Sequence, residues 1–224
     1  MEELDTKRPE GDQREPLSRT RILACALAMI DRYGLEALSM RRLAAELDVS
    51  AMSLYNHVPN KDALLEGVTE ALLGEIDLSA VAREEWDEAL RAGFRSFRTA
   101  LLSHPNALPL IQTKPIVTPE AFRPVELSLA TLRRAGFESN TALEAHWVLV
   151  GFTIGHVSFQ LTNPLNDPLT SESEMFLRRQ QLPAEEFPNL FECLPHAIGC
   201  DFDAAYAFGL DTIIEGLRVR LATT

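Results

Sequence analysis

Polar and aromatic side chains cluster between residues 51 and 61, and their types suit contact with nucleic acid. Asn56 can pair with the edge of adenine in a major groove, and Met52 can contact thymine methyl groups. Hydroxyl, imidazole and ammonium groups can hydrogen-bond phosphates, which position a protein on a duplex without specifying sequence. We therefore predict a DNA-reading surface made of Arg41, Ala51, Met52, Ser53, Tyr55, Asn56, His57 and Lys61.

Two short helices are predicted to present this surface. Ser39 and Ser50 are residue types that cap helix N-termini, and a tight turn at 48–50 separates the two helices. Two helices joined by so short a turn can offer the second one, here about 51–57, to a major groove. The apolar residues expected to face inward are Met40, Leu43, Ala44, Leu47, Val49, Leu54 and Val58.

Longer helices are predicted on both sides of this pair. One begins after the cap Ser18 and ends at Gly34, because glycine is common just past a helix C-terminus. The other begins at Lys61 after the cap Asn60 and runs to about Ile76. This second helix is expected to link the reader to the rest of the chain.

The remainder also has helical periodicity, so the predicted fold class is all-α. Helices are expected over 86–104, 119–136 and 141–160, and a last one from Asp201 or Asp203 to about Arg220. Residues 163–199 contain five of the 13 prolines and are expected to form a long excursion. The charged segment 1–16 is expected to be a disordered tail.

Charge is unevenly distributed along the chain. The net charge of −12 alone would argue against DNA as a partner, because phosphates bind basic surface. Residues 14–61, however, hold seven basic and five acidic groups, whereas residues 62–224 hold 12 basic and 23 acidic groups. The segment around the proposed reader is therefore positive, and an acidic body would repel DNA from the other faces.

Enzyme, metal and membrane functions find little support. Nucleophile-elbow, zinc-protease, P-loop and dinucleotide-binding motifs do not occur, so we expect no enzyme. Cys193, His196 and Cys200 lack a fourth ligand and a C-x2-C spacing, so no metal or cofactor is expected. The three cysteines, Cys25, Cys193 and Cys200, suggest no disulfide framework. No apolar stretch approaches the roughly 18 residues of a membrane span, and we expect a cytoplasmic protein.

Aromatic and apolar residues in the second half could line a ligand cavity or form plain core, and periodicity leaves both open. Apolar cavities suit hydrophobic small molecules. Gly151 and Gly155, four residues apart, permit close helix packing either between two subunits or within one chain. The candidate ligand-binding residues are Phe94, Phe97, Leu101, Ile111, Phe122, Trp147, Phe152 and His156.

The motifs at 34–35, 39–44, 49–50, 53–58 and 60–65 together make residues 17–76 resemble the DNA-binding domain of the TetR family. The motifs Phe97-Arg98, Thr113-Lys114-Pro115 and Gly136-Phe137 extend the resemblance, more weakly, into the second half. The resemblance implies a DNA-binding domain at 17–76 and a helical ligand-binding and dimerisation domain at 77–224. It also implies a homodimeric repressor on a palindromic operator, with 141–160 and the last helix forming a four-helix dimer interface.

Departures from the family bear on the effector. Asp77, Gly93, Leu110 and Ser128 stand near positions where tetracycline-responsive members hold the drug and its magnesium, so we expect a small hydrophobic effector and no tetracycline–metal complex. Met52 and Asn56 also depart from those members, which implies a different operator. Two alternatives stay open: activation instead of repression, and a small-molecule binding or sequestering protein whose reader does not function.

Overall fold

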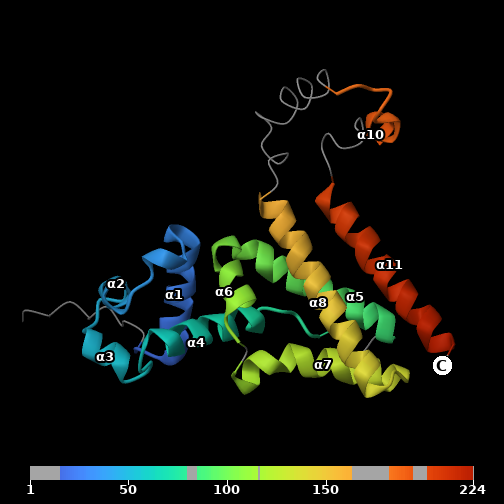
Figure 1. Cartoon of the computed structure of the whole chain (residues 1–224). Coiled ribbons are helices and arrows are strands. Elements are labelled where there is room, and N and C mark those ends of the chain that lie inside the picture. Colours follow the sequence, from blue (N-terminus) through green and yellow to red (C-terminus); the bar gives the residue numbers. More distant parts are fainter. Residues whose placement is uncertain (1–15, 80–84, 116, 163–181, 194–200, 224) are drawn as a thin grey trace, which may run out of the picture.

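The computed structural model describes residues 16–79, 85–115, 117–162, 182–193 and 201–223, and every regular element among them is a helix (Figure 1). This confirms the all-α prediction. The predicted tail, apart from Pro16, and most of the 163–199 excursion lie outside the described residues. The helices are α1 Arg19–Tyr33, α2 Met40–Glu46, α3 Ala51–Tyr55, α4 Lys61–Gly74, α5 Trp86–Ser103, α6 Leu108–Thr113, α7 Pro119–Ala135, α8 Ser139–Thr162, α10 Pro188–Cys193 and α11 Phe202–Ala222, with 3-10 turns η1 Leu35–Ala37 and η2 Pro105–Ala107.

Local capping chemistry sets the helix boundaries as predicted. Ser18 Oγ accepts a hydrogen bond from the Arg21 amide at 3.2 Å, which satisfies a free donor at the start of α1. Asp201, and not Asp203, caps α11, because its carboxylate accepts from the amides of residues 203 and 204. Gly34 ends α1 with φ of +81°, a conformation that a side chain would strain.

The helices form two packed groups joined by α4. α1 to α4 lie together at the left of Figure 1, and α5, α7, α8 and α11 form the larger group, in which α8 and α11 run side by side. α4 packs against α1 in the first group and against α5, α6 and α7 in the second. Its inner residues Leu64, Val68 and Leu72 are fully buried, so α4 is part of a continuous core.

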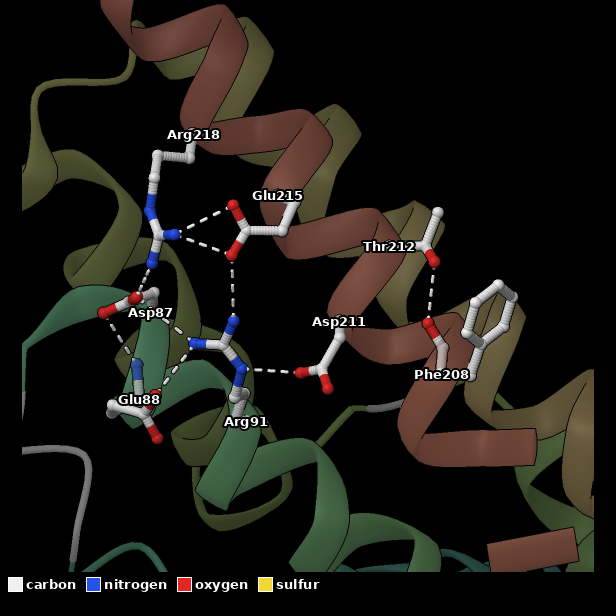
Figure 2. Close-up of polar contacts among 8 residues, drawn as sticks. All are labelled: Asp87, Glu88, Arg91, Phe208, Asp211, Thr212, Glu215 and Arg218. Carbon is white, nitrogen blue, oxygen red and sulfur yellow. Dashed lines mark hydrogen bonds and ion pairs between the residues drawn. The ribbon is translucent and has the colours of Figure 1, made fainter. Parts of the chain in front are cut away.

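A charged network fixes α11 on α5, as Figure 2 shows. The buried Arg91 guanidinium of α5 contacts Asp211 Oδ1 at 2.7 Å, Asp87 Oδ2 at 3.2 Å and Glu88 Oε1 at 3.0 Å. Arg218 of α11 in turn contacts Asp87. Burial acts to raise the pKa of Asp87, but hydrogen bonds from the Glu88 amide and the arginines outweigh it and hold that pKa below its ordinary value.

A histidine at the end of α5 joins the two groups of helices. His104 Nδ1 lies 2.8 Å from Asp31 Oδ2 of α1, and Nε2 lies 2.8 Å from Glu75 Oε2 at the end of α4. The Asn106 side chain donates to the Asp31 carbonyl at 2.9 Å. Burial acts to lower the pKa of His104, but its bonds to both carboxylates outweigh that effect and raise the pKa.

This raised pKa predicts a pH-dependent contribution to stability. The contribution of His104 should be fully present below the unfolded pKa of about 6.5 and be lost as pH rises through the higher folded pKa. In urea unfolding from pH 5.5 to 9, the stability advantage of the natural chain over a His104→Gln variant should therefore shrink as pH rises. Asn106→Ala, which removes a non-titrating partner of Asp31, should lower stability by a constant amount. A constant difference for His104→Gln as well would contradict the assignment.

Candidate DNA-reading surface and ligand cavity

The turn between α2 and α3 fixes the reader helix by backbone geometry. Asp48 takes a left-handed conformation with φ of +54°, and the Val49 amide donates to the Ala44 carbonyl at 3.0 Å. Ser50 Oγ then caps α3 by accepting from the Ser53 amide at 3.1 Å. Leu43 of α2 and Leu54 of α3 are both fully buried, so the two helices share one core as predicted.

Most of the predicted DNA-reading residues are exposed on one side of this unit. Met52 is 73 % exposed and Tyr55 45 % exposed, and the side chains of Tyr55, Asn56 and His57 make no hydrogen bond to any described residue. Ser53 differs, since it is half-buried and its hydroxyl lies 2.8 Å from Ser50 Oγ. The other exposed members of the set are Arg41, Ala51 and Lys61.

Arg42, beside the reader, has a local structural contact instead. Its guanidinium lies 5.2 Å from the centre of the Tyr33 ring and donates to the Ala37 carbonyl at 3.0 Å. The side chain therefore braces the start of α2 against the end of α1.

A cavity of about 480 Å³ lies between the end of α4 and helices α5 to α8. That size is ordinary for a drug-sized ligand. Its wall is almost wholly apolar, with Lys114, Ser128 and His146 as the polar exceptions among the described residues. The apolar lining includes Leu73, Ile76, Leu78, Leu90, Ala121, Val125, Leu127, Val150 and Ile154.

Five of the eight predicted ligand residues lie in this wall: Phe94, Phe97, Ile111, Phe122 and Trp147. The other three predicted residues, Leu101, Phe152 and His156, are not among the described residues that line this cavity. Leu101 is fully buried in the core. Phe152 stacks on Tyr206 of α11 with ring centres 5.3 Å apart, and His156 lies edge-on to the same tyrosine at 5.2 Å.

The three polar lining residues, Lys114, Ser128 and His146, are not among the eight candidate ligand-binding residues named from the sequence. His146 Nδ1 lies 3.1 Å from Ser128 Oγ, and burial lowers the pKa of His146, which favours a neutral imidazole. Lys114 Nζ lies 3.0 Å from Asp62 Oδ1 in the first turn of α4. The sequence did contain a signal for Lys114, because it is the one charged residue in the mainly apolar segment 107–117.

A row of small and apolar residues recurs every four positions along α8 and faces outward. Trp147 is 60 % and Phe159 61 % exposed, and Phe208 on the neighbouring α11 is 76 % exposed. A Cβ added at Gly151 or Gly155 would meet no described residue within 4 Å, so neither glycine packs closely against another described part of its own chain. We call this surface the α8–α11 face; it comprises Leu143, Trp147, Gly151, Gly155, Phe159, Phe208 and Val219.

Within the parts of the chain that are described, no group of three metal-ligating residues comes together, and Cys193 is exposed at the end of α10. His196 and Cys200, the other members of the weighed zinc cluster, lie outside the described residues. No described helix is both long and apolar enough to cross a membrane.

Comparison with known proteins gives consistent matches over nearly the whole chain. Residues 22–68 match the family of bacterial regulatory proteins called tetR, and residues 80–221 match the tetracyclin repressor-like C-terminal domain. A helix-turn-helix transcriptional regulator of Saccharopolyspora erythraea is 32 % identical, over 94 % of this chain and 89 % of its own length. The transcriptional repressor DrrR1 of Streptomyces coeruleorubidus is 30 % identical, over 96 % of this chain and 83 % of its own length.

Solved structures show the same architecture. Apo ActR from Streptomyces coelicolor superposes with a TM-score of 0.80 at 30 % identity, over 93 % of this chain and 98 % of ActR. ActR in complex with actinorhodin gives a TM-score of 0.79 at 31 % identity, over 92 % of this chain and 99 % of ActR. The same overall architecture thus occurs in a relative whose structure holds a small molecule.

Proposed function

Because this chain belongs to the TetR family of bacterial regulatory proteins and is a ligand-responsive transcriptional repressor, we propose that it binds a palindromic operator as a homodimer and leaves it when a small, mainly hydrophobic effector fills the cavity. In this proposal residues 17–76 form the DNA-binding domain and residues 77–224 bind the effector and the second subunit. The exposed side of α3, with Arg41 and Lys61 on either side of it, supplies the DNA contacts.

The observation that carries this mechanism is that α4 belongs to both sites. It begins at Lys61, directly after the turn that follows α3, and the cavity wall includes Leu73 in its last turn and Ile76 just beyond its end. A ligand that shifts the end of α4 therefore shifts the reader as well. The operator affinity falls by the difference in ligand binding energy between the two arrangements, and by no more.

A titration of duplexes separates this function from the sequestering alternative. Palindromic sites selected from a random library should bind with strong sequence preference and with an affinity that falls steeply as salt rises. An extract or compound library should then contain a small molecule that releases the duplex. A protein that binds the small molecule but ignores every duplex would support the sequestering alternative instead.

The dimer has its own test at Gly151. Alanine is a better helix former than glycine by about 1 kcal/mol, so in an isolated subunit Gly151→Ala should stabilise α8. If α8 packs on its symmetry mate, any side chain added at residue 151 enters the interface twice. The larger side chain of Gly151→Leu should then raise the dimer dissociation constant at least roughly tenfold.

Analytical ultracentrifugation over a dilution series measures that constant. Gly74→Leu is a matched control, because Gly74 also has open space around it but lies on α4, away from the α8–α11 face. Unchanged association in Gly151→Leu would place the subunit interface elsewhere.

A further inference from the structure

We propose that the effector is an aromatic acid, that Lys114 binds its acidic group, and that Asp62 is the counter-ion which Lys114 releases on binding. The inference rests on the proposed function and specifies the chemistry of the same cavity. It also names the contact through which the ligand's charge acts on the reader.

Lys114 is the one lysine, arginine or acidic side chain in the described cavity wall. It caps the end of α6, and the other lining residues are apolar except for Ser128 and His146. Its ion-pair partner among the described residues is Asp62, whose side chain is 78 % exposed. Ion pairs of exposed groups are weak, so Asp62 holds the ammonium group loosely.

A carboxylate or phenolate that enters the cavity would meet this ammonium group in a less polar setting. Charge-assisted hydrogen bonds are stronger than neutral ones, and the surrounding apolar wall reduces screening by water. An acidic ligand therefore outcompetes Asp62 for Lys114, whereas a neutral ligand leaves the pair intact.

The remaining lining describes the rest of the ligand. The rings of Phe94, Phe97, Phe122 and Trp147 offer flat apolar surface, which suits stacking with fused aromatic rings. His146 is held neutral and bonded through Nδ1 to Ser128, while its Nε2 has no hydrogen bond to a described residue. That nitrogen suits a neutral hydroxyl or carbonyl, so Lys114, the one cation among the described wall residues, selects a single acidic group.

The pair also connects the ligand to DNA binding. Asp62 follows Lys61, the predicted phosphate contact, in the first turn of α4. When the ligand takes Lys114, α4 loses a tie to α6 and Asp62 becomes an uncompensated negative charge beside the reader. A negative charge there repels phosphates, so an acidic effector weakens operator binding in a direct electrostatic way.

The test uses acids and their uncharged amides as matched probes: 2-naphthoate with 2-naphthamide, and anthraquinone-2-carboxylate with anthraquinone-2-carboxamide. Binding is measured by quenching of Trp147 in a Trp86→Phe background, where it is the one remaining tryptophan of two. At least one acid should bind roughly tenfold or more tightly than its amide. Lys114→Met should abolish this preference by lowering acid affinity to that of the amide, and Lys114→Arg should retain it.

Asp62→Asn tests the competition. It should raise acid affinity by about two- to fivefold, the range expected for a weak exposed pair, without changing amide affinity. The proposal is overturned if no acid binds, if the amides bind as well as the acids, or if Lys114→Met keeps the preference. Operator binding without ligand is measured in parallel: its absence would refute the proposed function, while the charge preference is judged by quenching alone.

Discussion

Replacing Tyr55 with alanine is expected to weaken operator binding by roughly 5- to 150-fold, the equivalent of about 1–3 kcal/mol for a well-placed contact. Tyr55 lies on α3 with 45 % of its side chain exposed, and its hydroxyl makes no hydrogen bond to a described residue. The neighbouring Leu54, in contrast, is fully buried in the core. Fluorescence anisotropy with a labelled operator measures the loss.

Tyr33→Ala provides the matched control. Tyr33 is 43 % exposed and belongs to the same module, but it lies at the end of α1. It should change operator affinity much less than Tyr55→Ala does. Both variants should keep the dimer dissociation constant of the natural chain, and Tyr55→Ala should keep its thermal stability. If Tyr55→Ala unfolds the module, or binds the operator unchanged, Tyr55 is a structural residue and not a DNA contact.

The second large effect is expected at Arg91. Arg91→Met should lower the free energy of unfolding by about 2–3 kcal/mol at a fixed protein concentration. Removing one member of a buried ion pair leaves the other charge uncompensated, and Asp87 is 9 % exposed. The estimate lies below that for a fully buried pair because Asp211 and Glu215 are about half exposed and remain hydrated.

Chemical denaturation followed by circular dichroism measures this change. Arg218→Met is the control, since that guanidinium is 48 % exposed and its loss leaves Asp87 bonded to Arg91. It should cost less than about 1 kcal/mol. Equal losses for the two variants would mean that Arg91 is not the centre of the network.

The reader module could be predicted from sequence because its signals are local. The caps Ser18, Ser39, Ser50 and Asn60 each bond an amide three residues later, so their spacing along the chain already defines the helix starts. The buried positions Leu54 and Val58 and the exposed Met52 follow from one turn of helix. The residues that define the helix-turn-helix unit therefore all lie close together in the sequence, within a stretch of about 40 residues.

The cavity could be predicted only in part because it depends on contacts between distant segments. Helical spacing places Leu101, Phe152 and His156 on helix faces that can be buried, but it does not say which neighbouring helix each side chain contacts. Tyr206, more than 50 residues after Phe152, decides that matter by stacking on it. Similarly, Arg91 and Asp211 lie 120 residues apart in sequence.

The length of α3 limits how much sequence one subunit can recognise. Five residues at about 1.5 Å each extend little more than 7 Å, roughly the rise of two base-pair steps. In the palindromic operator proposed above, each half therefore has few strictly required bases, although a chromosome offers on the order of 10⁶ competitors or more. Discrimination must then come largely from the separation of the two halves and the bendability of the DNA between them. If Met52 and Asn56 contact bases as proposed, a single substitution at either position would consequently redirect the protein to a new set of promoters.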